Sequence, residues 1–326
     1  ISYVSNKSKS KVMKIFKIVV GTLIVLTVGG YLFVKMHSVD DIPVEQLTSK
    51  WMYKTSTFVD VNGLRVHVSD EGANNSAVPI VLIHGTGASL HTWDGWVSEL
   101  KNERRVIRFD LPGFGLTGPE PDNNYTIEQY TNYVVGILDS LGVSEAIIAG
   151  NSLGGYIAWA TAVRYPNRVS KLVLVDASGY PYEAESVPIA FKLSQNKLAK
   201  LLLKNFIPKF VIRSSVENVF GNPALVTDYL VDRYYELTLR EGNRAAIKER
   251  FVQTQPGELR KLLPKLTIPT LILWGAKDKL IPLKLGKRFE KDIPNSSLII
   301  FDELGHVPHE EAPQITVSPV LDFINE

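Results

Sequence analysis

Short runs of apolar and β-branched residues alternate with longer helical stretches from Trp51 to the end of the chain. Several runs are apolar at every position, which is typical of strands that helices cover on both faces. The pattern therefore predicts an α/β fold, with a mostly parallel sheet flanked by helices. The predicted strands are residues 65–69, 80–83, 105–109, 146–149, 172–175, 270–274 and 298–301.

One helix between these strands is predicted with both of its ends. Thr126 is expected to cap the first turn, with Gln129 three positions further on, as in a capping box. Apolar residues then recur at helical spacing from Ile127 to Leu141, and Gly142 is expected to end the helix.

The strand pattern is absent between residues 179 and 263, where helical segments are separated by prolines. A helical segment between two strands of one sheet predicts a cap inserted into the core domain. We therefore divide the chain into a membrane anchor with its linker (residues 1–49), the first part of the core (50–178), the helical cap (179–263) and the second part of the core (264–326).

A basic segment crosses the predicted cap, with no acidic residue from residue 189 to residue 213. Leu198, Leu202 and Phe206 recur at i, i+4 spacing, which predicts an amphipathic helix that ends before Pro208. We expect its apolar stripe to pack on the core and its cations to face solvent. The alternative is that the cations lie against an anionic membrane surface. The cations are Lys192, Lys197, Lys200, Lys204, Lys209 and Arg213.

The N-terminal segment differs from the rest of the chain. Residues 18–34 carry no charge and, at about 1.5 Å per residue, span roughly 25 Å as a helix. Lysines cluster before this stretch, which predicts a single-pass transmembrane helix with a cytoplasmic N-terminus and the body on the far, periplasmic or extracytoplasmic, side. A cleaved signal peptide and secretion are the alternative, although no small-residue cleavage site follows the stretch. The lysines are Lys7, Lys9, Lys11, Lys14 and Lys17.

Composition excludes several kinds of chemistry. Lys and Arg number 36 against 34 Asp and Glu, so the net charge of +2 gives no field that would attract nucleic acid. The absence of cysteine excludes thiolate nucleophiles, disulfides and cysteine-bound metals. Covalent catalysis by this chain must therefore use another nucleophile.

The strongest catalytic signal is a G-x-S-x-G motif between a predicted strand and a predicted helix. Its residues are Gly150, Asn151, Ser152, Leu153 and Gly154. Glycines at both ends permit the sharp turn that exposes a serine hydroxyl at the carboxyl edge of a sheet, and the following helix brings backbone donors to the same point. Ser152 is therefore the predicted nucleophile.

A serine hydroxyl needs a general base, and the base needs a group that orients it. His306 is the predicted base, because it follows the last predicted strand and its loop can reach the same sheet edge. Asp278 follows the preceding strand and is the predicted carboxylate partner. Asp176, which follows the strand before that, and Asp302 are the alternatives. The order serine, aspartate, histidine is the order found in α/β-hydrolases.

The loop after the strand at residues 80–83 contains His84, Gly85, Thr86 and Gly87. Backbone N–H groups of Thr86 and Leu153 are predicted to form an oxyanion hole, worth about 3 kcal/mol per donor. His84 is expected to stabilise the turn. His309 is expected to be structural or to lie at the surface. His37, His67 and His91 have no sequence context comparable to that of His306.

Five motifs together resemble the α/β-hydrolase fold superfamily over residues 54–326. They are His84-Gly85, Asp110-Leu111-Pro112-Gly113-Phe114-Gly115, Gly150-Asn151-Ser152-Leu153-Gly154-Gly155, Trp274-Gly275-Ala276-Lys277-Asp278 and Gly305-His306-Val307-Pro308. The resemblance implies a nucleophile elbow at Ser152, a catalytic triad with Asp278 and His306, an oxyanion hole, a cap, and no cofactor or metal. Asp110 resembles a recurrent turn residue with a structural role.

The resemblance also reduces the number of possible activities. Haloalkane dehalogenases and epoxide hydrolases of this fold use an aspartate where Ser152 stands, which argues against both. We expect a carboxylesterase or lipase that cleaves a small ester with an apolar acyl group through an acyl-enzyme. The alternative is a C–C hydrolase of the meta-cleavage-product type, although those enzymes typically carry Trp where this chain has Val307. A perhydrolase and a non-catalytic ligand receptor are further alternatives.

Overall fold

The computed structural model describes residues 2–73, 77–195, 207–257 and 259–326. Its centre is an eight-stranded sheet with the order β1-β2-β4-β3-β5-β6-β7-β8. Strands β3 to β8 are parallel, whereas β2 runs antiparallel to β1 and β4. The strands are β1 (Ser56–Val61), β2 (Leu64–Gly72), β3 (Ile80–Ile83), β4 (Arg105–Phe109), β5 (Ala146–Asn151), β6 (Val169–Val175), β7 (Thr270–Gly275) and β8 (Ser296–Phe301).

The seven predicted strands correspond to β2 through β8, so the predicted fold class is confirmed. Strand β1 was not predicted. It forms a hairpin with β2 through Asn62 and Gly63, whose φ angles are 54° and 80°. Two positive φ angles in a two-residue loop are the signature of a type I′ turn, and Asn-Gly is its preferred sequence. This dipeptide is the signal that predicts the hairpin.

Helices cover both faces of the sheet, because alternate side chains of each strand point to opposite faces. On one face Ile148 of β5 belongs to the core that contains Trp159, and on the other Ile147 belongs to the core that contains Trp96. The first face is covered by α4 (Ile127–Ser140), α5 (Leu153–Arg164) and α11 (Lys284–Asp292), and the second by α3 (Asp94–Leu100) and α13 (Pro313–Asn325).

Helix α4 begins and ends as predicted. The side chain of Thr126 accepts a hydrogen bond from the Gln129 backbone N–H at 3.3 Å. The helix ends at Ser140, and Gly142 follows with a φ of 67°. A left-handed residue just past the last turn is the common way to end a helix, and glycine adopts it without a Cβ clash.

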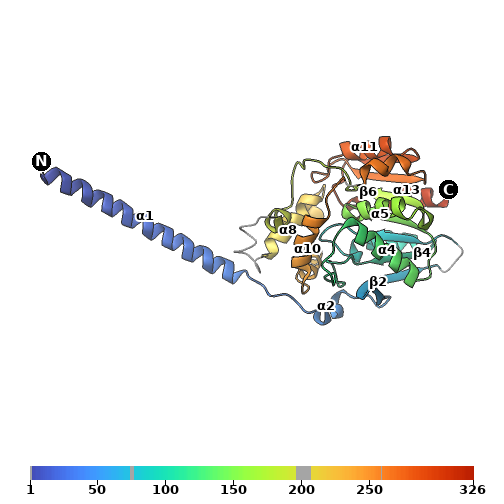
Figure 1. Cartoon of the computed structure of the whole chain (residues 1–326), viewed down its shortest axis with the longest axis horizontal. Helices are drawn as coiled ribbons and strands as arrows, with labels where there is room; N and C mark the ends of the chain where they lie inside the picture. The colour runs from blue at the N-terminus through green and yellow to red at the C-terminus, as the bar shows by residue number, and fades with distance from the viewer. Residues whose placement is uncertain (1, 74–76, 196–206, 258) are drawn as a thin grey trace.

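The described residues between 179 and 263 contain helices and no strand, as predicted for the cap. Figure 1 shows α8 and α10 on the side of the sheet that faces α1. The cap contains α6 (Ile189–Gln195), α8 (Lys209–Val219), α9 (Asp228–Thr238), α10 (Asn243–Gln253) and the 3-10 turns η3 (Pro223–Leu225) and η4 (Arg260–Lys265).

Most of the predicted basic helix before Pro208 lies in residues 196–206, outside the described residues. Three of the six cations of the basic segment are described. Lys192 is exposed in α6, and the two that follow Pro208 are paired with carboxylates of the cap. Lys209 forms an ion pair with Asp232, and Arg213 forms ion pairs with Asp228 and Glu217. These two side chains therefore form part of the contacts within the cap.

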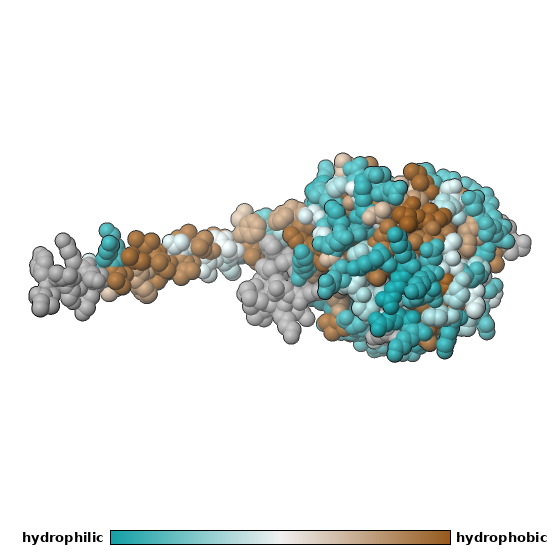
Figure 2. Space-filling view, turned by 90° about the horizontal axis from the view of Figure 1, so that it is seen from above, coloured by the Kyte–Doolittle hydropathy of each residue, from teal (hydrophilic) through white to brown (hydrophobic). Residues whose placement is uncertain are grey.

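Helix α1 (Ser2–Met36) projects from the body as an isolated rod (Figure 1). Its segment Ser10–Met36 is long and apolar enough to cross a membrane, and none of the most apolar window is buried against the body. Figure 2 shows this apolar surface against a body whose visible face is largely hydrophilic. A signal sequence has the same length and composition, so these properties alone leave both predicted fates of the segment open.

The segment after α1 is attached to the cap. Asp41 pairs with Arg244, and the backbone N–H of Ile42 donates to the Leu239 carbonyl at 2.7 Å. Helix α2 (Val44–Trp51) then buries Leu47 and Trp51. The Trp51 indole N–H donates to Glu236 at 2.8 Å. Residues 41–51 therefore pack on the body, although the sequence pattern assigned most of them to a linker.

We expect a chain that begins at Ser38 to keep the full stability of the body, because every contact of residues 41–51 is retained. In that chain, Trp51→Ala should lower the free energy of unfolding by roughly 3–5 kcal/mol, since a fully buried indole is lost. Urea unfolding followed by circular dichroism measures the change. Leu225→Ala, at a residue that is 47% exposed, is the control and should change little. Equal stability of the two variants would contradict the prediction.

Candidate active site

Ser152 lies in the turn between β5 and α5, with a φ of 55°. This left-handed conformation costs a non-glycine residue about 1–3 kcal/mol and persists only where neighbours enforce it. Close backbone approach enforces it here. A Cβ on Gly154 would lie 2.1 Å from the Ile83 carbonyl oxygen, and one on Gly150 would lie 2.2 Å from the Gly154 carbonyl oxygen. Both motif glycines are therefore required for the turn.

His306 and Asp278 meet as predicted. The Nδ1 of His306 lies 2.7 Å from Oδ2 of Asp278, and both side chains are buried. The other Asp278 oxygen accepts hydrogen bonds from the backbone N–H groups of Leu280 and Ile281, each at 2.8 Å. A carboxylate that accepts hydrogen bonds from three donors is held in one orientation. It fixes the tautomer in which Nδ1 carries the proton and Nε2 is free to accept one.

The main chain of His306 is held from two sides. Its N–H donates to the Val219 carbonyl of the cap at 2.8 Å. Its carbonyl accepts a hydrogen bond at 2.9 Å from the side-chain amide of Asn151, which also donates to the Val175 carbonyl at 3.1 Å. The residue before the predicted nucleophile therefore connects the turn after β5 to β6 and to the loop that carries the predicted base.

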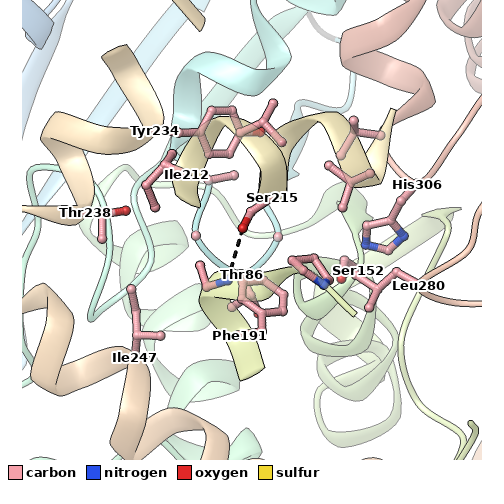
Figure 3. A pocket seen from close by; sticks show the side chains of 18 of the residues that line it. Thr86, Ser152, Phe191, Ile212, Ser215, Tyr234, Thr238, Ile247, Leu280 and His306 are labelled. Carbon is pink, nitrogen blue, oxygen red and sulfur yellow. Dashed lines mark hydrogen bonds between the residues drawn. The ribbon is translucent and has the colours of Figure 1, made fainter. Parts of the chain in front are cut away.

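Ser152 and His306 line the same pocket, which lies between the sheet edge and the cap. Figure 3 shows both at one end of it, and Thr238 and Ile247 at the other. Most of its walls are apolar side chains of the cap, and none of the described residues that line it is acidic. The apolar walls include Ala190, Phe191, Ile207, Val211, Ile212, Val216, Val219 and Ile247.

The two predicted oxyanion donors flank Ser152. Leu153 is the first residue of α5, so its N–H has no acceptor within the helix. Thr86 lines the pocket in a loop that approaches the nucleophile closely. A Cβ on Gly85 would lie 3.1 Å from the Ser152 Cβ. The loop and the helix end therefore meet at the serine, as an oxyanion hole requires.

His84 and Asp110 make structural contacts, in agreement with their predicted roles. The buried His84 ring accepts a hydrogen bond from the Leu111 N–H at 2.9 Å, and burial lowers its pKa, so it is neutral. Asp110 accepts from the N–H groups of Leu90 and Leu116, each at 2.8 Å. Burial opposes the charge of Asp110, but the adjacent His67 ring holds its pKa well below the usual range.

The other described histidines have contacts away from the pocket. His309 is buried against Trp93, with Nε2 3.1 Å from the Thr92 hydroxyl, and burial lowers its pKa. His91 lies 2.8 Å from the Trp51 carbonyl oxygen, and burial lowers its pKa to about 4. Both rings are therefore neutral near pH 7 and support the structure around them.

The alternative carboxylates occupy different environments. Asp302 is exposed after β8. Asp176 is fully buried beside the predicted pair, and polar atoms of Asp176, Asp278 and His306 lie within 4.8 Å of one another. This spacing suits a metal ion, but the 2.7 Å hydrogen bond between His306 and Asp278 already uses the two atoms that face each other. Sequence reasoning named Asp176 as a rival of Asp278, whereas the structure places both carboxyl groups at one site.

Comparison with known proteins points to one family. A family model described as the alpha/beta hydrolase fold matches residues 78–313. A 2-hydroxy-6-oxononadienedioate/2-hydroxy-6-oxononatrienedioate hydrolase of Burkholderia vietnamiensis is 32% identical over 87% of this chain and 98% of its own length.

Two solved structures are similar over most of the chain. A meta-cleavage product hydrolase from Pseudomonas fluorescens has a TM-score of 0.72 and 26% identity, covering 82% of this chain and 97% of its own. A membrane phospholipase A has a TM-score of 0.72 and 23% identity, covering 95% of this chain and 98% of its own. The second match is wide enough to include part of α1, and at that identity it shows a likeness of fold alone.

We expect Ser152→Ala to lower the turnover of a nitrophenyl ester by roughly 10⁴- to 10⁶-fold, because the other groups of a triad cannot replace its nucleophile. The free energy of unfolding should stay within about 1 kcal/mol of the original protein, since only a hydroxyl is removed. Initial rates and urea unfolding measure the two effects. Ser98→Ala, at an exposed residue, is the matched control. An acylation burst retained in Ser152→Ala would contradict the assignment.

Proposed function

Because this chain belongs to the alpha/beta hydrolase fold family, we propose that it is a serine hydrolase with Ser152 as nucleophile, His306 as general base and Asp278 as the group that orients His306. The 2.7 Å hydrogen bond between His306 and Asp278, next to a pocket lined by both His306 and Ser152, carries this proposal. The strained turn at Ser152 supports it, since such strain is concentrated at functional sites.

The proposed reaction has two halves. The Ser152 Oγ attacks the substrate carbonyl carbon while His306 Nε2 takes the hydroxyl proton. Backbone N–H groups of Thr86 and Leu153 stabilise the negative oxygen that forms. Collapse of this intermediate breaks the bond to the leaving group, which receives the proton from His306. Water then attacks the acyl-enzyme with His306 again as base, and this sequence needs no cofactor.

We propose a carboxylic ester with an apolar acyl group as the substrate. The apolar walls that the cap contributes to the pocket support this choice, because burial of an acyl chain there gains about 25 cal/mol per Å². The fold likeness to a membrane phospholipase A, which extends into α1, is consistent with it.

Hydrolysis of a C–C bond in a meta-cleavage product is the second candidate. The named relatives support it more strongly than they support ester hydrolysis, since they are C–C hydrolases with higher sequence identity. Arg244 and Lys248 in the pocket lining would suit the carboxylates of such substrates. Val307, in place of the Trp typical of those enzymes, is an argument against it. No observation in the described part of the chain favours the perhydrolase or receptor alternatives.

A direct comparison of substrates distinguishes ester hydrolysis from C–C bond hydrolysis. We expect the best nitrophenyl ester in a series of graded acyl length to exceed a ring-fission dienone acid in kcat/KM by at least about 10-fold, because apolar walls favour the neutral acyl chain. Initial rates with the same enzyme preparation measure this, and Ser152→Ala gives the background for both. A ring-fission product cleaved as fast as the best ester would favour the C–C candidate.

We propose that α1 is a membrane anchor. Its exposed apolar side chains and the lysines before them support this proposal. The ring of His37, just after α1, contacts Phe210 of the cap at a centroid distance of 6.4 Å, and Phe210 is 57% exposed. An anchored α1 would therefore bring an apolar part of the cap close to the lipid, where an apolar substrate would be concentrated.

We expect the full chain to remain with membranes in high salt and to be released by detergent, because apolar burial is insensitive to ionic screening. The chain that begins at Ser38 should be found in the soluble fraction. Sedimentation followed by immunoblotting measures both. Release of the full chain by salt alone would contradict an anchor. A mature protein that has lost α1 in cells would indicate the signal-peptide alternative.

A further inference from the structure

Asp176 is a second carboxyl group behind the proposed triad. Its Oδ1 accepts a hydrogen bond from the Gly275 N–H at 3.0 Å, whereas its Oδ2 is buried with no donor among the described residues. The backbone φ of 44° lies in the left-handed region, which costs conformational energy at an aspartate. A fully buried carboxyl in a strained conformation, with a second carboxyl group within 4.8 Å, requires a physical explanation.

The ionisable groups around Asp176 are Asp278 after β7, His306 after β8 and Glu311 in α12 (Pro308–Glu311). Donors are distributed unevenly among the three carboxyl groups. Asp278 has Leu280, Ile281 and His306, and Glu311 has the N–H groups of Gly221, Asn222 and Gly305. Among the residues that the structure describes, Asp176 has a single donor, the N–H of Gly275.

Two carboxylates this close and this deeply buried do not both ionise, because desolvation and repulsion penalise the second charge. Burial, followed by the negative charge of Asp278, raises the pKa of Asp176 well above its usual range. Asp176, which has one donor, therefore keeps its proton. A protonated Asp176 can donate through Oδ2, which otherwise has no role.

We propose that Asp176 is a positioning residue whose neutral carboxyl donates a hydrogen bond to Asp278 and so fixes the carboxylate that orients His306. The proposal rests on the proposed function, because it assigns Asp176 a role in the same triad. The sign of the pH effect follows directly. The neutral form is present below the pKa of Asp176, so its contribution is complete at low pH and is lost as pH rises through that pKa.

Two substitutions of Asp176 separate the effect of its hydrogen-bond donor from the effect of its charge. Asn in Asp176→Asn still donates a hydrogen bond, tolerates the left-handed conformation and cannot ionise. Asp176→Gly also tolerates that conformation but removes the donor. We expect Asp176→Asn to keep kcat within about 3-fold and to lose the alkaline decline of activity. Asp176→Gly should lower kcat by about 10- to 100-fold, the value of one hydrogen bond to a charged group, with KM little changed.

The measurement is the profile of kcat and KM from about pH 5 to about pH 10. Asp302→Asn is the matched control, because it makes the same change at an exposed residue after β8, another parallel strand of the sheet. Asp176 lies outside the pocket lining, so an effect on kcat with KM retained is the expected pattern for a group that acts through Asp278. An unchanged alkaline decline in Asp176→Asn would overturn the proposal.

A double mutant tests whether Asp176 and Asp278 share one negative charge. In Asp278→Asn the repelling carboxylate is gone, so Asp176 is expected to ionise, within 4.8 Å of His306. Asp278→Asn should then retain activity at least about 10-fold above Asp278→Asn/Asp176→Asn, because only the double variant lacks a carboxylate for the imidazolium. Equal activities of the single and double variants would overturn the proposal.

A readout without turnover separates this proposal from the proposed function. Infrared difference spectra between the original protein and Asp176→Asn should contain the carbonyl band of a neutral carboxylic acid at pH 7, whether or not any substrate is known. Labelling of Ser152 by a fluorophosphonate tests the nucleophile independently. Loss of labelling with the acid band present would contradict the proposed function alone, and a carboxylate band for Asp176 at pH 7 would overturn the inference alone.

Discussion

The loops that carry Ser152, Asp278 and His306 follow different parallel strands whose carboxyl ends meet at one edge of the sheet, and the side chain of Asn151 holds that edge together. Its amide donates to the carbonyls of His306 and Val175, so the turn at Ser152 is connected to the neighbouring strand end and to the loop of His306. These groups are far apart in sequence. Their hydrogen bonds fix relative positions to the fraction of an ångström that proton transfer requires.

The cap covers the same edge of the sheet. The Val219 carbonyl at the end of α8 accepts from the His306 N–H, so the cap helix holds the loop of His306 and also forms part of the pocket wall. A change in the cap that alters substrate fit therefore also changes the support of His306. A substitution that moves Val219 is therefore expected to affect both substrate binding and the position of His306.

Local sequence patterns predict much of the fold and of the candidate site. Continuous apolar runs predict β3 and β5, and the spacing of Gly150 and Gly154 predicts the turn at Ser152. The relation of Asp176 to Asp278 could not be predicted, because both follow parallel strands and only the pairing of β6 with β7 decides how near they are. The packing of Trp51 could not be predicted from the sequence either, because its hydrogen-bond partner Glu236 lies 185 residues further along the chain.

The segment between α1 and the body contacts a residue that lines the pocket. Asp41 binds Arg244 through Nε at 2.8 Å, and Arg244 is part of the pocket lining. The carboxylate neutralises part of the charge that Arg244 would otherwise present to a substrate, and it fixes the direction in which the guanidinium points. Residues 41 and 42, which follow α1, are therefore connected to the cap through one ion pair and the backbone hydrogen bonds of Ile42. The segment that follows α1 is thereby part of the structure that shapes the pocket.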